Sequence, residues 1–548
     1  MHKKRFWIIW ITLILAGSAL AAEEKNPSDS KAVEDKSSAK DGSAATKQDV
    51  EEKPTFDIFE YEVVGNTVLD KWKIEESVYD YMGEKKTIDD VEKARSALEK
   101  TYHDAGYLTV SINIPQQEVN AGKVKLEVLE GKVERLRVTD SHYYSLGVIK
   151  ERVGEFAEGS VPNFTVAQKQ LATVNRGANR QVTPILRPGK SPGKVEVDLK
   201  VQDQLPLHGS VELNDRYSAN TTHTRLNGSV RYENLWQLDH SIGLSFQMSP
   251  EDTNEVKVVS GTYVIPMLSG DYFAAYGVVS RSNIAAVGDV SVIGNGNILG
   301  ARYIHPLPQL EGYYHTLTAG MDYKDFKESI VLLGADEDIK TPISYTMFNL
   351  GYDGTYQTGR SQTQVNLGLN FSVRALGNSE REFGLKRSEA KPNFAVLNMD
   401  VKHLQKLPKD WGLQARLGGQ LASEPLISAE EFSVGGVDSV RGYTESNSLG
   451  DNGAFASLEL RTPSFQKYFK DYLKDAYAYG FLDGGYARTL RPLPSQIASA
   501  HLLSTGLGMK LKAIKGMFAN LDYAHALHDA GDVKNGDDRL HFRLGYEW

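Results

Sequence analysis

From His208 to the C-terminus, the sequence consists of repeated strand-sized segments in which apolar and polar residues alternate. Residues 365–373 alternate Val, Leu, Leu, Phe and Val with Asn, Gly, Asn and Ser, and residues 224–232 follow the same pattern. A period of two residues gives a strand one apolar and one polar face. Any single strand of this kind could also belong to a soluble β-sandwich. The accumulation of such segments favours a transmembrane β-barrel that comprises residues 205–548. That length allows about 16 antiparallel strands.

The last segment continues the alternation to the final residue. Leu540, Phe542, Leu544, Tyr546 and Trp548 form one apolar face. A terminal strand of this kind resembles the signal by which outer-membrane assembly machinery recognises barrels, so we expect Tyr546 and Trp548 to act as an assembly signal. An ordinary terminal strand that ends in tryptophan is the alternative.

The N-terminal part of the chain has the pattern of compact α/β structure. From Phe56, the sequence predicts a strand, two helices with apolar residues at helical spacing, and two alternating strands at 110–114 and 124–128. The same β-α-α-β-β order recurs from Val133. We therefore expect two modules of about 75 residues, at 56–131 and 132–204, each with one sheet and two helices as its core.

The first residues predict export from the cytoplasm. Basic residues precede an apolar run from Phe6 to Leu15, and Ala19-Leu20-Ala21 has the small-x-small pattern of a cleavage site. We expect residues 1–21 to be a cleaved signal peptide, since the apolar run is shorter than the about 20 residues of a membrane anchor. Residues 22–55 contain few large aliphatic side chains and predict a disordered linker.

The composition of the chain further limits the kinds of protein that it can be. Cleavage after Ala21 would remove three positive charges and no negative ones, which changes the formal net charge from −9 to −12 and argues against nucleic acid as a partner. The chain has no cysteine, which excludes disulfides and thiolate metal sites. No later segment approaches the about 18 consecutive apolar residues of a transmembrane helix. The 27 tyrosines suit the aromatic girdles of a barrel.

Two glycine-rich motifs lie late in the predicted barrel. The sequence reads FSVGGVDSVRGY at 432–443 and FLDGG at 481–485. These motifs resemble the two signatures of the superfamily that includes two-partner secretion transporters and BamA-type insertases. The resemblance implies that Val440, Arg441, Gly442 and Tyr443 form the tip of a loop folded into the lumen, where Arg441 meets Asp483 on the barrel wall. A planar guanidinium suits this contact because a carboxylate can accept from it bidentately.

The other motif residues have roles that follow from this arrangement. We expect Gly435, Gly436 and Gly442 to allow the tight or positive-φ backbone of the loop, and Gly485 to leave room on the wall where the loop docks. Tyr443 and Phe481 would supply aromatic packing around the ion pair.

The N-terminal modules distinguish between the members of this superfamily. The stretch from Gly65-Asn66-Thr67 to Leu129-Glu130-Gly131 resembles the first POTRA domain of two-partner secretion transporters, the TpsB family of hemolysin activator/secretion proteins. Only two modules fit before the barrel, whereas BamA-type insertases usually carry more. The expected fold is therefore mainly β, with a transmembrane antiparallel barrel preceded by two α/β POTRA domains. Some relatives have a plug helix where this chain has residues 22–55, and that helix stays an alternative to the linker.

The resemblance implies a function as an outer-membrane translocation pore of a Gram-negative bacterium, with its POTRA domains in the periplasm. The partner would be an unfolded exoprotein with a β-helical passenger, such as a hemolysin or an adhesin, and the chain would also contact outer-membrane lipid and the barrel assembly machinery. An exposed sheet edge can add an extended segment as a strand. We expect that edge at the residues Val182, Thr183, Ile185 and Leu186.

Two other functions are compatible with the sequence. An insertase would share both motifs and open between the first and last strands, whereas a passive porin or a surface adhesin would not need the POTRA modules. Catalysis is not expected, because Pro184 stands where a P-loop ending in Gly189-Lys190-Ser191 would need glycine. His525, His528 and His541 lack the ligand spacing of a zinc site. The sequence therefore predicts no enzyme activity, no cofactor and no metal.

Overall fold

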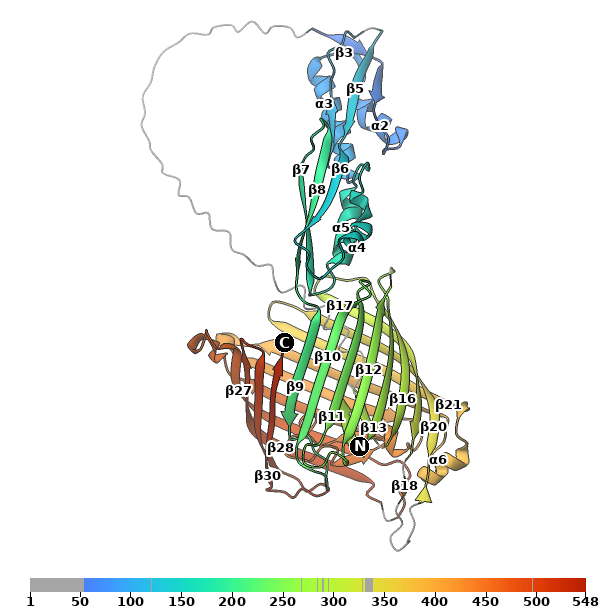
Figure 1. Ribbon diagram of the computed structural model, residues 1–548, viewed down its shortest axis with the longest axis vertical. Coiled ribbons are helices and arrows are strands. Elements are labelled where there is room, and N and C mark those ends of the chain that lie inside the picture. The colour runs from blue at the N-terminus through green and yellow to red at the C-terminus, as the bar shows by residue number, and fades with distance from the viewer. Residues whose placement is uncertain are drawn as a thin grey trace. The chain divides into compact units, whose positions relative to one another are not determined.

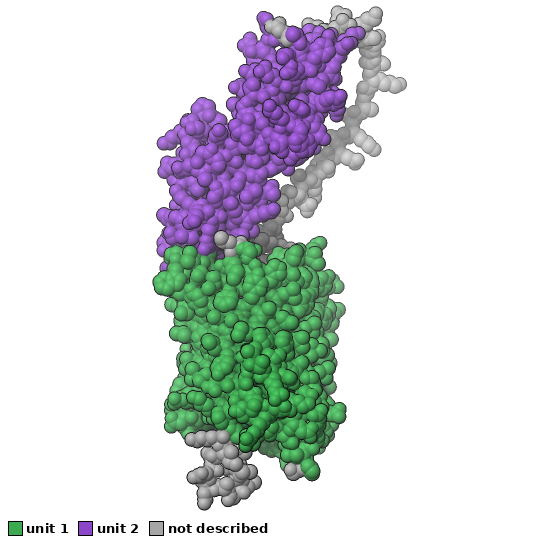
Figure 2. All heavy atoms as spheres, turned by 90° about the vertical axis from the view of Figure 1, so that its right-hand side faces the viewer, with its two compact units in different colours: residues 1–13, 206–548 green, residues 14–205 purple. Residues whose placement is uncertain are grey.

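The computed structural model describes residues 54–119, 121–267, 269–282, 284–287, 290–293, 295–327, 329–330, 339–494 and 496–548. The chain divides into two compact units, of which one ends at Leu205 and the other begins at Pro206 (Figure 2). The predicted signal peptide and the predicted linker, apart from its last two residues, lie outside the described residues. Within the described ranges, no helix is long and apolar enough to cross a membrane.

The first POTRA module is built on a three-stranded sheet. Strand β2 (Glu60–Val64) runs parallel to β5 (Lys123–Glu130), and β4 (Val110–Asn113) pairs antiparallel with the other edge of β5. The helices α2 (Lys71–Val78) and α3 (Ile88–Asp104) pack against it through the buried residues of the module core, which include Ile74, Val91, Leu98, Tyr102 and Leu126.

The predicted β-α-α-β-β order of this module was incomplete. A short strand, β3 (Gly83–Lys86), lies between the two helices and pairs with β1 (Phe56–Ile58). Its sequence, GEKK, has no apolar alternation, so only its pairing with β1 makes it a strand. The peptide N–H of Lys85 also donates to Asp57 Oδ1 at 3.0 Å.

Helix α3 begins with a capped N-terminus. Thr87 and Asp90 form a capping box, in which the Thr87 N–H donates to Asp90 Oδ2 at 3.0 Å. This hydrogen bond, together with those from the Thr87 and Lys93 side chains, holds the pKa of the Asp90 carboxyl at about 2. After the helix, Gly106 has a φ of +98°, which is the left-handed conformation expected of a glycine at a helix C-terminus.

The second module repeats the architecture. Strand β6 (Lys132–Thr139) runs parallel to β8 (Lys194–Asp203), β7 (Arg180–Pro188) pairs antiparallel with β8, and helices α4 (Leu146–Arg152) and α5 (Phe164–Val174) complete the module. The sheet order is β6-β8-β7, so β7 is an edge strand.

In the part of the chain that the structure describes, 16 antiparallel strands close a barrel (Figure 1). They are β9 (Leu207–Asn214), β10 (Arg225–Leu235), β11 (His240–Met248), β12 (Lys257–Pro266), β13 (Tyr272–Arg281), β16 (Gly296–Pro306), β17 (Tyr313–Phe326), β20 (Ile343–Gln357), β21 (Ser361–Gly377), β22 (Phe394–Lys406), β23 (Gly412–Ala422), β26 (Asn452–Arg461), β27 (Leu473–Arg488), β28 (Ser499–Ala513), β29 (Met517–Ala526) and β30 (Asp538–Glu547). The short pairs β14 (Ile284–Val287) with β15 (Val290–Ile293), β18 (Ser329–Ile330) with β19 (Ile339–Lys340), and β24 (Phe432–Val434) with β25 (Ser448–Gly450) lie in the connections.

The two faces of the barrel strands have the reverse of the usual burial. On β21, Leu367 and Leu369 are 38% and 39% exposed, whereas Asn366 and Asn370 are 8% and 7% exposed. A soluble sandwich would bury the leucines and expose the asparagines. An apolar outer face around a polar interior is instead the pattern of a membrane barrel, so the predicted transmembrane barrel is confirmed.

The last strand closes the barrel against the first. The β30–β9 ladder runs from Arg543↔Asn214 to Glu547↔Ser210, and Trp548 exchanges backbone hydrogen bonds with Gly209 at 3.0 and 3.2 Å. A Cβ atom on Gly209 would lie 2.1 Å from the Trp548 ring, so only glycine fits beneath it. The Trp548 and Tyr546 rings stack with their centroids 5.8 Å apart.

The connections differ between the two ends of the barrel. At the end where β9 begins, short turns such as 236–239, 358–360 and 514–516 join the strands; the opposite end, here called the long-loop end, carries connections such as 378–393, 423–451 and 527–537. Outer-membrane barrels have short periplasmic turns and longer extracellular loops. The long-loop end is therefore the extracellular end.

Candidate functional site

The connection between β23 and β26, residues 423–451, folds into the barrel and is here called the inward loop. Its β24 and β25 form a two-stranded hairpin, and Val434, Val440 and Tyr443 at and near its tip are 0% exposed. The tip contacts Glu459, Asp483 and Asp522, whose chain neighbours Leu458, Leu482 and Leu521 are exposed on the outer face. The contacted side chains therefore belong to the lumen wall.

Glycines allow the loop to reach the wall. Gly435, Gly436 and Gly442 have φ values of +113°, +98° and +88°, in the region that favours glycine. On the wall, a Cβ atom at Gly485 would come within 2.3 Å of a Val434 methyl and 2.7 Å of a Val440 methyl. A larger residue at Gly485 would therefore displace the loop.

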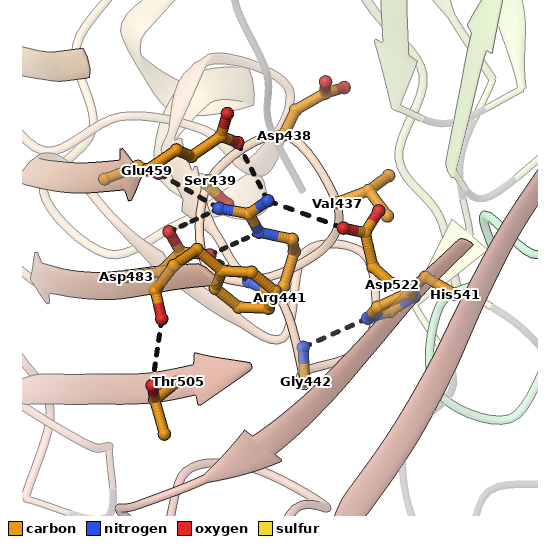
Figure 3. A network of polar contacts seen from close by, with 12 residues as sticks. Val437, Asp438, Ser439, Arg441, Gly442, Glu459, Asp483, Thr505, Asp522 and His541 are labelled. Carbon is orange, nitrogen blue, oxygen red and sulfur yellow. Dashed lines mark hydrogen bonds and ion pairs between the residues drawn. The ribbon is translucent and has the colours of Figure 1, made fainter. Parts of the chain in front are cut away.

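Arg441 is bound to the wall through most of its guanidinium (Figure 3). Its Nε and Nη2 donate to the two carboxylate oxygens of Asp483 at 2.7 and 2.8 Å, and its peptide N–H donates to Asp483 Oδ2 at 3.2 Å. The guanidinium carbon lies 3.6 Å from the centroid of the Phe481 ring. Since Arg441 is 5% and Asp483 1% exposed, this bidentate pair is shielded from solvent.

Further carboxylates surround the same guanidinium. Arg441 Nη1 donates to Glu459 Oε1 at 2.9 Å and lies 3.6 Å from Asp522 Oδ1. Arg461 Nη2 donates to the other oxygen of Glu459 at 2.9 Å, and the Tyr479 hydroxyl donates to Asp522. Neither Glu459 nor Asp522 was predicted from the sequence. The only available signal was that both residues occupy inward-facing positions on strands β26 and β29. Many inward-facing positions are polar, so this signal does not single them out, and their contact with Arg441 depends on the path of the loop.

The backbone at the tip is held by the last strand. The Gly442 N–H donates to His541 Nε2 at 3.0 Å (Figure 3). His541 Nδ1 lies 2.9 Å from Asp215 Oδ2. Asp215 follows β9 and also accepts from the Phe542 N–H at 2.8 Å. This arrangement links the loop tip to the first and last strands of the barrel, a role for His541 that sequence reasoning missed.

The remaining motif residues also contact the wall. The Tyr443 hydroxyl donates to the His528 carbonyl at 2.7 Å and accepts from the Leu503 N–H at 3.2 Å.

His525 lies 2.8 Å from Asp538, away from the tip. Among the described residues, no group of three or more His, Cys, Asp and Glu side chains could hold a metal ion.

A cavity of about 350 Å³ lies beside the tip in the lumen. Its lining is dominated by charged side chains, which include Lys402, Arg416, Arg441, Asp483, Lys510 and Asp522. Such a lining suits water and an extended polypeptide better than an apolar small molecule, whose sites are mainly hydrophobic.

The predicted client-binding residues lie on the edge strand β7. Val182 is buried, whereas Ile185 and Leu186 are 37% and 38% exposed. Of the predicted assembly signal, Tyr546 lies near the end of β30 and Trp548 directly follows the strand; they are 45% and 51% exposed.

Two family models match the sequence. The model described as haemolysin secretion/activation protein ShlB/FhaC/HecB matches residues 193–511, and the model of the ShlB-type POTRA domain matches residues 56–131. Thus the first match covers more than half of the chain, and the second coincides with the first module.

Relatives and solved structures agree with these matches. The heme/hemopexin transporter protein HuxB of Haemophilus influenzae is 21% identical over 83% of this chain and 80% of its own length. The outer membrane transporter CdiB of Dickeya dadantii is 22% identical over 70% and 68%, respectively.

Among solved structures, CdiB from Escherichia coli has a TM-score of 0.58 at 18% identity and covers 92% of this chain and 93% of its own. BamA from Haemophilus ducreyi lacking POTRA domains 1–3 has a TM-score of 0.53 at 12% identity, over 90% and 100%. These two likenesses show a shared fold. The family-model match is the finding that assigns the sequence: the chain belongs to the haemolysin secretion/activation protein family ShlB/FhaC/HecB.

Proposed function

We propose that this chain secretes a partner exoprotein across the outer membrane: its POTRA modules receive the unfolded partner in the periplasm, and its barrel conducts it outward. The observation that carries the proposal is the buried contact of Arg441 with Asp483, which holds a loop inside a closed barrel with a polar interior. A loop held in this way occupies the lumen and has to move for a polypeptide to pass.

The relatives support a protein as the transported substrate. HuxB is named a heme/hemopexin transporter, CdiB an outer membrane transporter, and HpmB of Proteus mirabilis a hemolysin transporter. By this analogy, the partner of the present chain is a secreted protein. We infer that it carries a β-helical passenger, since a repetitive β fold can form progressively as the chain emerges. Folding outside the cell would then give the transport its direction.

The edge of β7 is the proposed site of capture. The other edge of the same sheet, β6, is already used: the Val133 N–H donates to the Ser160 carbonyl at 2.8 Å, and the Val133 carbonyl accepts from the Gly159 N–H at 2.7 Å. An incoming strand would have to displace that segment. The outer edge of β7 offers a less obstructed place for strand addition.

Hydrogen bonding along β7 narrows the site to its second half. The backbone N–H and carbonyl of Val182 are bonded to the Asn175 side chain at 2.7 and 2.9 Å. Because outward and inward backbone groups alternate along an antiparallel strand, positions 184, 186 and 188 also face outward. Pro184 and Pro188 have no N–H, so Leu186 supplies the outward donor of this stretch. Capture is therefore expected at Ile185 and Leu186.

Removal of the POTRA modules tests the function. A chain that lacks residues 56–201 should still insert as a heat-modifiable barrel and should lose export of its partner, measured as partner protein in the medium. Export that persists without the modules would favour a passive porin. A general loss of other outer-membrane proteins on deletion of the whole gene would favour an insertase.

The proposal includes no chemical step. The residues at the loop tip act by holding and releasing the loop, and no enzyme activity, cofactor or metal is assigned to them. Outer-membrane lipid would surround the apolar face, and the barrel assembly machinery would fold the chain.

A further inference from the structure

An apolar cluster lies inside the barrel at its long-loop end, where a polar lumen is expected. The wall residues in it lie near the long-loop ends of their strands: Val258, Val278, Ile298, Phe326, Ile343 and Phe394. Phe383, Leu426 and Ile427 join them from two connections rather than from the wall. The cluster is therefore complete only while both connections are in place.

The first of these connections, residues 378–393, contains helix α6 (Glu380–Lys386) at the barrel rim (Figure 1). A capping box of Ser379 and Glu382 begins the helix, and Phe383 on its buried face is 1% exposed. The Phe383 ring lies 5.7 Å from that of Tyr345 and 6.3 Å from that of Phe394, between centroids. The helix is thus packed into the lumen end by an aromatic side chain.

Arg387, directly after α6, joins this connection to the inward loop. Its Nη1 donates to the Leu426 carbonyl and to Asp451 Oδ1, both at 2.9 Å, and also to Glu431. Its Nη2 donates to Asp451 Oδ2 at 2.7 Å and to the Leu490 carbonyl at 3.0 Å. Leu426 and Asp451 belong to the two arms of the inward loop, so one guanidinium holds both arms.

Asp451 is the partner on which this contact depends. It is 0% exposed and accepts hydrogen bonds from the Leu426 and Leu490 N–H groups, each at 2.6 Å, in addition to those from Arg387. If Arg387 moved away, a buried carboxylate would lose its charge partner, which is costly in a shielded site. The base of the inward loop is therefore held as specifically as its tip, where Arg441 binds Asp483.

We propose that Arg387 is a positioning residue for secretion, which couples the inward loop to the α6 connection so that withdrawal of the loop and opening of the extracellular end occur as one step. Leu426 and Asp451 stand at the base of the inward loop, so a withdrawal that moves the loop together with its base displaces one of them and breaks the Arg387 contacts. Those contacts also hold the connection that inserts Phe383. This inference rests on the proposed function.

The test measures potassium chloride conductance of the full-length protein in planar bilayers, which requires no partner protein. Arg387→Ala should raise the open probability by about tenfold, within the about 5- to 150-fold range typical of coupling between sites. Arg387→Lys should lie between this variant and the unaltered protein, because an ammonium cannot bridge both oxygens of Asp451 and the two carbonyls together. Asp451→Asn, which keeps the shape of the side chain, should have the same effect as Arg387→Ala.

Arg491→Ala is the matched control. Arg491 bonds to Glu389 of the α6 connection at 3.1 Å and lies 3.4 Å from Glu424 of the inward loop, so it joins the same two connections as Arg387, but the side chains of Arg491 and Glu389 are about half exposed. Exposed pairs of this kind contribute little. Its conductance should equal that of the unaltered protein.

Coupling is distinguished from a local structural role by the double variant Arg387→Ala/Arg441→Ala. If base and tip act as one step, the combined change in open probability is smaller than the product of the single changes. A combined change equal to the product of the two single changes would overturn the coupling. So would an Arg387→Ala channel whose open probability is as low as that of the Arg491→Ala control. Heat-modifiability in detergent confirms that each variant is folded; if Arg387→Ala is not, Asp451→Asn replaces it in the same comparison.

A cross-link gives an independent test, since the chain has no cysteine of its own. Lys391 and Glu424, whose side chains are 3.1 Å apart, join the α6 connection to the first arm of the inward loop. Cysteines at these positions, bridged by a reagent that a reductant cleaves, should block partner export until reduction. Unimpeded export through the bridged protein would contradict the coupling. A different result would contradict the proposed function itself: undiminished export by the chain that lacks residues 56–201.

Discussion

At the loop tip, the contacts of Arg441 require the planar guanidinium group that only arginine provides. Nε and Nη2 bind Asp483, while Nη1 reaches Glu459 and Nη2 also reaches Ser457 Oγ at 3.2 Å. The flat face of the guanidinium lies on Phe481. A lysine could approach one of the carboxylates but could not bridge them or stack in the same way.

Replacement of Arg441 by alanine should reduce export while the barrel stays folded. The substitution leaves Asp483 buried without its partner, a loss that typically costs about 3–5 kcal/mol in a shielded site, and it frees the loop tip. Partner protein in the medium measures export, and heat-modifiability measures folding. Arg374→Ala is the control, because Arg374 is 63% exposed and lies 3.6 Å from an exposed glutamate. Undiminished export by Arg441→Ala would contradict the role of the loop tip.

At the scale of elements, β7 shows how an edge strand can be open to a partner and still be protected. Asn175 occupies the backbone of Val182, and prolines at 184 and 188 remove outward donors. These features limit unspecific pairing, as natural sheet edges commonly do. The stretch that remains is short and includes the half-exposed Ile185 and Leu186.

Leu186→Pro should weaken binding of the partner to the POTRA modules, because it removes the outward N–H of this stretch without charge change. Leu186→Ala is the matched variant: it retains the N–H and loses most of the side chain. If main-chain pairing dominates, the alanine variant binds nearly as well as the unaltered chain and the proline variant binds at least several-fold more weakly, measured by titration of the partner's secretion domain. Equal affinities of the proline variant and the unaltered chain would exclude this edge.

The elements differ in how far the sequence could predict them. Period-two alternation predicted the barrel strands, and helical spacing predicted α3, because these signals are local. Strand β3 was missed, since its sequence GEKK becomes a strand only by pairing with β1. The loop motif pointed to Arg441 and Asp483, but Glu459, Asp522, His541 and Arg387 were not predicted. Their contacts join segments distant in sequence, and these depend on where the inward loop runs inside the closed barrel.

At the scale of the whole molecule, Trp548 extends the β30–β9 ladder that closes the barrel. Trp548 exchanges backbone bonds with Gly209 and covers it with its ring. The same residue ends the apolar face of β30. The Trp548 ring thus packs across the junction of the first and last strands, where the predicted assembly signal would act.

Trp548→Ala should lower the fraction of chains that reach the outer membrane as closed barrels, since the predicted assembly signal loses its aromatic end. Leu544→Ala is the matched control, as Leu544 has the same 51% exposure on the same strand but is not terminal. The heat-modifiable fraction in isolated outer membranes is the measurement. Equal assembly of the two variants would mean that loss of apolar surface, rather than the terminal aromatic, explains any defect.

The alternation along the barrel strands also bears on how the chain travels before it folds. Between Val365 and Val373 of β21, an asparagine, glycine or serine separates each apolar residue from the next, so this strand lacks the about 18 consecutive apolar residues that the inner membrane would retain as a helix. The leucines of β21 gather into a continuous belt only when hydrogen bonding aligns them with their neighbours. The continuous apolar surface that binds lipid therefore forms only when the barrel folds, so the unfolded chain has little affinity for a membrane before it reaches the outer membrane.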